Sequence, residues 1–441
     1  PVQPRARAAR SPRRLTLQRR SPAFVLVLLR VASHAGCAAH PASAAGQAQS
    51  AVSQTPSTSR ASATSSRPPA AATPSRPPAA ATPSGSRVSS ALWSSAVVQS
   101  KAVAAATTSK PRVFAYYYLW WSLNHWKTSL GSAYPTTASP LPLPAQLDAI
   151  GCSPKSLYAG NILTDVPGKL YSQDDPGFIE ADVRQAAAAG LTGFAVNWAG
   201  TGSPTQTVNS SPYSRRLQAM VDAVHKVNAE GTPFKLWLSY KASAVVLAQS
   251  QIDGDLGYFL NKYGNDPAFE RVQSPKPTII WQGSRKYAIS TLQAISAKYR
   301  SKLRILGDET TWSPSRAPYL DGNAYYWSSQ SPYSNPQSFQ HLAALAASVR
   351  ASGTNPDGSN KVWVAPFTPG YDKQLAGGSS CVPRYSGRTM KTLFDGNAAT
   401  HPDDFGLISW NEITEGSYVD PMTRYGSQDL TMLKSIIANG S

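Results

Sequence analysis

Eight short apolar runs recur between residues 111 and 441, and this repetition limits what the chain can fold into. Each run is four to six residues long and consists mainly of apolar or aromatic residues. The runs are Val113–Tyr118, Gly193–Trp198, Lys235–Tyr240, Thr278–Trp281, Leu303–Leu306, Ala324–Trp327, Val362–Pro366 and Phe405–Ser409. Because they show little polar–apolar alternation, we expect strands that are buried on both faces.

Segments with the apolar spacing of helices lie between several of these runs. They are Phe178–Ala189, Arg215–Ala229, Tyr287–Tyr299 and Phe339–Ala351. Strands that alternate with helices form a parallel sheet covered on both faces. Eight such units close most simply as a barrel, for which roughly 250 to 400 residues is an ordinary size. We therefore predict an α/β fold, a single (β/α)8 TIM barrel over residues 111–441.

The residues before this barrel have a different composition. The first acidic residue is Asp148, and residues 1–110 hold 14 of the 42 lysines and arginines, so most of the net charge of +18 belongs to the tail. An arginine-rich start followed by the apolar stretch Phe24–Leu29 resembles a secretory signal, which we place at residues 1–44. Cleavage after Ala44 and lipid attachment at Cys37 are both compatible with it. Residues 45–110, rich in Ala, Ser, Thr and Pro, are predicted to be a disordered linker.

Several classes of function do not fit the sequence. The basic tail lacks the interleaved aromatic residues that bind single-stranded nucleic acid, and no run approaches the roughly 20 apolar residues of a membrane-spanning helix. The six histidines show no paired spacing, and no glycine-rich phosphate loop is present. We expect a monomer with no cofactor, no metal and no nucleic-acid partner. Cys152 and Cys381 form either a disulfide or two small buried apolar positions.

The C-terminal ends of the strands hold the active site in TIM barrels, so residues there are site candidates. Aromatic rings stack on the C–H faces of sugars, while amides and carboxylates bind hydroxyl groups. The candidate substrate-binding residues are Tyr117, Tyr118, Trp120, Trp121, His125, Asn197, Trp198, Tyr240, Asp308, Glu309, Tyr326, Trp327, Trp410 and Asn411. Because neighbouring residues on an extended backbone point to opposite faces, only one of Asp308 and Glu309 can reach the site.

Two carboxylates three residues apart, Glu412 and Glu415, follow the last apolar run directly. In one helical turn such side chains lie about 5–6 Å apart at Cβ, a spacing suited to the paired carboxylates of glycosidases. The alternative is a capping box, in which Ser409 and Glu412 open a helix and Glu415 is a solvated acid of its first turn. We predict that Glu412 and Glu415 are catalytic.

Four segments together resemble glycoside hydrolase family 99, which includes the endo-α-mannosidases, and more distantly the family 71 α-1,3-glucanases. They are VFAYYYLWW at 113–121, LYSQDDPGFIEADVRQAAAAGLTGFAVNWAG at 170–200, PGYD at 369–372 and ISWNEITEGSYVDP at 408–421. The resemblance implies a (β/α)8 barrel and retaining chemistry in which Glu412 deprotonates the sugar 2-hydroxyl and Glu415 protonates the leaving oxygen. Ile413 and Thr414 stand where the mannosidases usually carry an aromatic residue and a histidine, and family 71 enzymes have Asp in place of Glu412.

These patterns predict a glycoside hydrolase, a secreted retaining endo-α-glycosidase that acts on an α-linked polysaccharide of the α-mannan or α-1,3-glucan type. We expect it outside the cell or at the cell surface, with a polysaccharide or glycan as its partner. The alternative is a non-catalytic carbohydrate-binding barrel at the cell surface, and a third interpretation is a structural surface protein.

Overall fold

The computed structural model describes residues 110–131, 134, 152, 162–202, 212–241, 246–271 and 273–440. The predicted signal segment at 1–44 and almost all of the predicted linker at 45–110 therefore lie outside the described residues. The barrel predicted for residues 111–441 lies largely within them.

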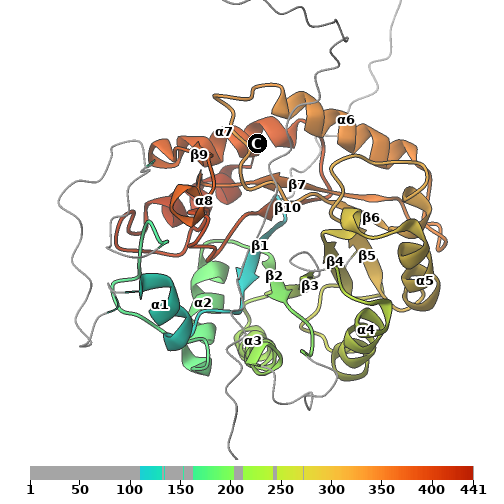
Figure 1. Ribbon diagram of the computed structural model, residues 1–441, viewed down its shortest axis with the longest axis horizontal. Helices are drawn as coiled ribbons and strands as arrows, with labels where there is room; N and C mark the ends of the chain where they lie inside the picture. Colours follow the sequence, from blue (N-terminus) through green and yellow to red (C-terminus); the bar gives the residue numbers. More distant parts are fainter. Residues whose placement is uncertain are drawn as a thin grey trace, which may run out of the picture. The chain divides into compact units, whose positions relative to one another are not determined.

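Eight parallel strands form a closed barrel (Figure 1). In their order around the barrel they are β1 (Val113–Tyr118), β10 (Asp404–Leu407), β7 (Val362–Phe367), β6 (Gly322–Ala324), β5 (Arg304–Gly307), β4 (Thr278–Gln282), β3 (Lys235–Lys241) and β2 (Gly193–Trp198). The first strand, cyan in Figure 1, closes the barrel by pairing with both β2 and β10. The predicted TIM barrel is confirmed.

Seven of the eight predicted strands overlap the observed ones closely, but the prediction for β6 was wrong by two to three residues. The strand is Gly322–Ala324 rather than Ala324–Trp327. A Cβ on Gly322 would lie 2.2 Å from the carbonyl oxygen of Val362 on β7, so this position requires glycine. Glycine and asparagine are poor strand formers by themselves, and here the pairing with β5 and β7 overrides that preference.

Helices cover the outside of the barrel. They are α1 (Leu123–Leu130), α2 (Pro176–Ala188), α3 (Pro212–Ala229), α4 (Gln249–Tyr263), α5 (Ile289–Tyr299), α6 (Ser338–Ala351), α7 (Arg388–Ala398) and α8 (Gln428–Asn439). The four predicted helices correspond to α2, α3, α5 and α6. The connection from β5 to β6 carries only a 3-10 helix, Ala317–Tyr319, where a regular (β/α)8 barrel has an α-helix.

A groove of about 710 Å³ lies where that helix is replaced. It is lined by residues of the β5–β6 connection, the end of α6 and the segment before β7. Lys361 closes part of the gap, because its ammonium group donates to the carbonyl oxygens of Ala317 at 2.9 Å and Leu320 at 2.5 Å. Burial lowers the pKa of Lys361 to about 8. Since Lys361 immediately precedes β7, it marks the N-terminal end of the barrel.

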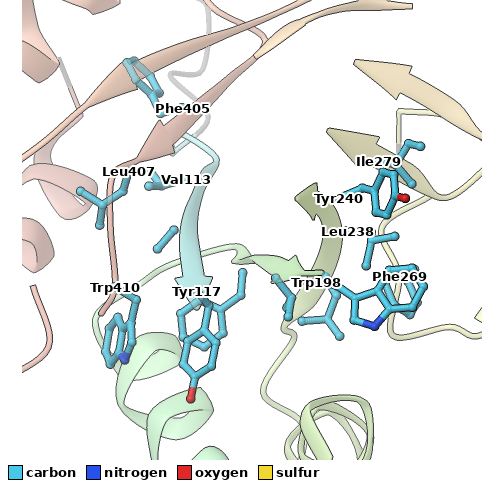
Figure 2. Close-up of a cluster of buried hydrophobic side chains, with 14 of the residues drawn as sticks. Val113, Tyr117, Trp198, Leu238, Tyr240, Phe269, Ile279, Phe405, Leu407 and Trp410 are labelled. Carbon is cyan, nitrogen blue, oxygen red and sulfur yellow. The ribbon is translucent and has the colours of Figure 1, made fainter. Parts of the chain in front are cut away.

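The side chains of the strands separate into two layers. Alternate residues, such as Tyr116, Trp237 and Val364, form a cluster made only of strand residues and their near neighbours, which is the barrel interior. The residues between them pack with the helices, and Figure 2 shows Tyr117 and Trp410 in this helix-facing layer. The separation follows from the two-residue period of a strand.

A short hairpin, β8 (Tyr371–Asp372) and β9 (Cys381–Val382), follows β7. Cys381 forms a disulfide with Cys152, with the two Cα atoms 5.9 Å apart, so the first of the two alternatives for these cysteines is the observed one. Within the described part of the chain, no helix is long and apolar enough to cross a membrane. The same residues contain no group of three or more His, Cys, Asp or Glu side chains that could hold a metal ion.

Asp182 on α2 and Asp420 beyond β10 are buried carboxyl groups outside the barrel interior. The Tyr117 hydroxyl donates to Asp182 at 2.7 Å. Burial raises the pKa of Asp182 to about 7, although the Tyr117 hydrogen bond opposes the shift. Burial, and then the charge of Asp182, raise the pKa of Asp420 well above its usual range. The folded chain therefore favours the protonated carboxyls.

We predict that Asp182→Asn stabilises the protein more at pH 8 than at pH 5. Between the unfolded pKa of about 4 and the folded value, the native state keeps a proton that the unfolded chain has released, so stability falls as pH rises through this window. The amide of the Asp182→Asn variant cannot ionise, so the variant does not lose stability in this way as pH rises. Melting temperatures from pH 4 to 9 should show the gap between variant and wild type widening by roughly 2–4 °C or more.

Asp222→Asn, which changes an exposed carboxylate on α3, is the control and should leave the pH dependence unchanged. If the melting temperatures of Asp182→Asn and wild type differ by the same amount at every pH, Asp182 has no such role.

Candidate active site

The segment after β10 forms a tight turn that carries both predicted catalytic glutamates. The Ser409 hydroxyl accepts a hydrogen bond from the backbone N–H of Glu412 at 2.7 Å, as in the capping-box alternative. Residues 413–416 form a turn and do not begin a helix. Both glutamates are buried, with 4% of Glu412 and 8% of Glu415 exposed, so Glu415 is not the solvated acid of that alternative.

The hairpin after β7 holds the far side of this turn. The backbone N–H of Asp372 donates to the carbonyl oxygen of Glu415 at 2.8 Å. Gly416 has φ +59°, and a Cβ there would lie 3.0 Å from the Asp372 nitrogen, so the turn requires glycine. The Arg384 guanidinium donates to the Gly416 carbonyl oxygen at 2.8 Å. The path of the backbone through Glu415 is therefore fixed by contacts with another loop.

Asn411 fixes the near side of the turn to the end of β1. Its side-chain oxygen accepts from the Tyr118 N–H at 2.7 Å, and its side-chain nitrogen donates to the Tyr118 carbonyl oxygen at 3.1 Å. The Trp121 indole N–H donates to the Asn411 carbonyl oxygen at 2.8 Å. Both ends of the amide are thus engaged by backbone, and Asn411 acts as a clamp. The predicted role of Asn411 as a sugar ligand is therefore not part of the site described here.

The carboxylate of Glu415 has a partner on each oxygen. The Lys373 ammonium lies 3.1 Å from Oε1, and the Ser328 hydroxyl donates to Oε2 at 3.1 Å. About 10% of each side chain of the ion pair is exposed. Ser328 comes from the segment beyond β6, and Lys373 from the loop beyond β8.

Two tyrosines of the barrel interior, Tyr118 at the end of β1 and Tyr326 beyond β6, pair with each other. The Tyr118 hydroxyl donates to the Tyr326 hydroxyl at 2.6 Å. Burial raises the pKa of Tyr326 well above its usual range, and the nearby Tyr118, Glu415 and Glu412 raise it further. Tyr326 therefore keeps its proton, and because its oxygen accepts from Tyr118, that proton can be donated to another group. Ser328, two residues beyond Tyr326, donates to Glu415, so the segment that carries Tyr326 reaches one of the two glutamates.

Asp308 and Glu309 point to opposite faces, as predicted. Asp308 accepts from the backbone N–H groups of Gly283 at 2.9 Å and Tyr326 at 3.0 Å, on the interior side. Glu309 forms an ion pair with Arg316 at 2.9 Å in the helix-facing layer. Asp308 thus positions Tyr326, while Glu309 lies outside the barrel interior.

The same alternation sorts the other candidates. Asn197 faces the interior, where its amide donates to Gln282 at 2.9 Å. Five of the aromatic candidates lie in the helix-facing layer or pack against it. They are Tyr117, Trp198, Tyr240, Trp327 and Trp410. Their rings are packed among the helices and not in the barrel interior. A substrate contact by these residues therefore stays a prediction, and the site described here does not include them.

The aromatic residues that follow β1 serve two purposes. Trp121 is fully buried and stacks on Trp126 with ring centroids 4.1 Å apart, so it belongs to the packing that supports the turn. Trp120 is half-buried and stacks on Tyr118 at 4.4 Å, next to the interior cluster. His125 contacts the edge of Trp121 at 4.6 Å. Trp120 is therefore the more exposed of the two tryptophans, and its contact with a sugar stays a prediction.

Sequence reasoning missed Ser328 and Lys373. Ser328 lies in a turn beyond the end of β6, so no strand period in the sequence marks it. Nothing in the sequence spacing relates Lys373 to Glu415, because the two meet only through the contact between the hairpin and the turn. The groove beside Lys361 lies at the opposite end of the barrel from Glu412 and plays no part in this site.

Fold and site together define a (β/α)8 barrel with paired carboxylates beyond its last strand. Solved structures of the family 99 endo-α-mannosidase from Bacteroides thetaiotaomicron are similar to this chain. One aligns with a TM-score of 0.54 and 15% identity over 75% of this chain and 98% of that chain. A second aligns with a TM-score of 0.53 and 15% identity over 74% and 96%. No family model matches the chain. At this identity the likeness establishes the fold.

We predict that Asn411→Ala destabilises the protein by about 1–3 kcal/mol, the cost of removing one partner from a buried hydrogen bond. The substitution removes both hydrogen bonds between Asn411 and Tyr118, while the Tyr118 carbonyl oxygen keeps the one that the Gln173 amide donates at 2.7 Å. Denaturant unfolding measures the loss. Asn439→Ala, which removes an exposed amide from α8, should change the free energy of unfolding by less than about 0.5 kcal/mol. If the two variants lose the same free energy of unfolding, Asn411 does not hold the turn against β1.

Proposed function

We propose that the protein is a secreted retaining endo-α-glycosidase, a hydrolase of O-glycosyl bonds in an α-linked glycan. The observation that carries the proposal is the placement of Glu412 and Glu415, both buried, on one turn at the C-terminal end of the barrel. TIM-barrel enzymes have their active sites at this end. The structural likeness to endo-α-mannosidase supports the same proposal.

In the first step, Glu412 takes the proton of the sugar 2-hydroxyl, and that oxygen forms a bond to the anomeric carbon. The bond from the anomeric carbon to the leaving oxygen breaks, and Glu415 gives its proton to that oxygen. The product is a 1,2-anhydro sugar. Tyr326 can donate a hydrogen bond to charge that develops beside the pair.

In the second step, Glu415, now a carboxylate, takes a proton from water while the water oxygen bonds to the anomeric carbon. The bond between this carbon and O2 breaks, and Glu412 returns its proton to O2. Each step inverts the anomeric carbon, so the two together retain its configuration. Both glutamates end in their starting protonation states.

This chemistry favours one of the two substrate types. O2 can attack the anomeric carbon only from the face opposite the leaving oxygen. In an α-mannoside the 2-hydroxyl and the leaving oxygen lie on opposite faces, whereas in an α-glucoside they lie on the same face. We therefore place α-mannan ahead of α-1,3-glucan. The Cys152–Cys381 disulfide supports secretion, because disulfides persist in oxidising compartments.

We predict that Glu415→Gln lowers hydrolysis of α-mannan by about 10²–10⁴-fold, since general acid–base catalysis contributes that much. The amide keeps the shape of the side chain and removes the proton donor, so binding should persist. Release of reducing ends and isothermal titration with mannan oligosaccharides measure the two effects. Glu230→Gln, an exposed change at the end of α3, is the control and should be fully active.

A variant that retained more than a tenth of the wild-type rate would refute the role of Glu415. If the wild-type protein binds α-mannan and α-1,3-glucan but releases no reducing ends from either, the protein is the non-catalytic carbohydrate-binding barrel instead.

The stereochemistry is a separate prediction. Two acids on one short turn do not straddle a sugar and a water from opposite sides, as inversion requires. NMR of the first-formed product should show the α-anomer from an α-linked substrate. Initial appearance of the β-anomer would exclude the two-step route.

A further inference from the structure

The carboxylate of Glu415 lies between two donors of different chemistry, and this asymmetry has a catalytic consequence. The Lys373 ammonium group faces Oε1 at 3.1 Å, and the Ser328 hydroxyl faces Oε2 at 3.1 Å. An ammonium group can only donate hydrogen bonds, whereas a hydroxyl can donate or accept. Oε1 must therefore remain an acceptor in every protonation state. A proton on Glu415 is confined to Oε2.

Lys373 is held in place by its own loop. Its backbone carbonyl oxygen accepts from the N–H of Gly378 at 2.9 Å, and a Cβ on Gly378 would lie 3.0 Å from the Lys373 Cβ. The neighbouring Asp372 N–H donates to the Glu415 carbonyl oxygen. The backbone of Lys373 and the backbone of Glu415 are thus tied to each other, and the lysine side chain spans the distance from there to Oε1.

We propose that Lys373 and Ser328 are positioning residues for Glu415, which orient its carboxyl group so that Oε2 carries the proton to the leaving oxygen. The inference rests on the proposed function. When the proton moves from Oε2 to the leaving oxygen, the O–H bond of Glu415 breaks and a negative charge appears on the carboxylate. Lys373 stabilises that charge at Oε1 without moving, because its ammonium group is already in contact.

The test compares substrates that do and do not need a proton on the leaving group. Lys373→Met keeps the length of the stem and removes the charge, and Lys373→Arg keeps the charge. With α-mannan oligosaccharide, Lys373→Met should lower kcat/KM about 10–100-fold, a part of what general acid catalysis supplies. With the corresponding α-mannosyl fluoride, whose fluoride leaves without prior protonation, the loss should be less than about threefold. Lys373→Arg should recover most of the oligosaccharide activity.

Ser328→Ala approaches the same carboxylate from its other oxygen and should show the same dependence on the leaving group, with a smaller loss. Lys391→Met removes an exposed lysine of α7 that pairs with Asp395, and it should leave both substrates unaffected. A crystal structure of Lys373→Met should show the Glu415 carboxyl group rotated away from its present plane. This readout does not depend on activity.

Equal losses on both substrates, or an unrotated carboxyl group in Lys373→Met, would overturn the inference. Measurements on Glu415→Gln in parallel separate its failure from that of the proposed function. The comparison uses kcat/KM, which reports the first step, because Glu415 also acts as the base of the second step with both substrates. If Glu415→Gln lowers kcat/KM only for the oligosaccharide while Lys373→Met lowers it equally for both substrates, Glu415 is the acid and Lys373 does not act through it. If Glu415→Gln keeps its oligosaccharide activity, the proposed function itself fails.

Discussion

Closure of the barrel between β1 and β10 is the constraint on which the site depends. It joins the first and last strands of the folded chain and brings Asn411 to Tyr118, which lies 293 residues earlier. A planar amide that bonds both the N–H and the carbonyl oxygen of one residue permits only one relative placement of the two segments. Because Glu412 is the next residue, this contact also places the backbone of the first of the two glutamates.

The turn that follows Asn411 carries two buried carboxyl groups, and neighbouring residues supply the hydrogen-bond donors that such groups need. A buried carboxylate without partners is costly, so each one needs a donor or a proton. Glu415 has Lys373 and Ser328, and Asp308 accepts from two backbone N–H groups. Beside Trp410 of the same segment, burial raises the pKa of Asp182 to about 7 and so favours its protonated form. The segment after β10 thus has one face that carries the two glutamates and another face that packs against α2.

Much of this arrangement could be read from the sequence. The eight apolar runs and the helical segments between them determine a parallel barrel, because strands buried on both faces need helices around them. The acids after the last run are local in sequence, so their position at the end of a strand was predictable, as was the opposite orientation of Asp308 and Glu309. Applied to every strand, the same two-residue period would also have separated Tyr118 and Tyr326 from Tyr117 and Trp327.

Tertiary structure alone decided the remainder. The strand β6 contains Gly322 and Asn323, whose own preferences argue against a strand, and it forms because β5 and β7 lie on either side. Asn411 was indistinguishable from a sugar ligand until closure placed it against Tyr118. Lys373 and Glu415 are 42 residues apart and share no pattern, since an ion pair leaves no periodic trace in a sequence. The sequence by itself determined the barrel and the position of its two acids, because these arise from local periodicity and the ends of strands. Only the folded chain decided which groups surround those acids, because such contacts depend on loops from distant strands meeting at one end of the barrel.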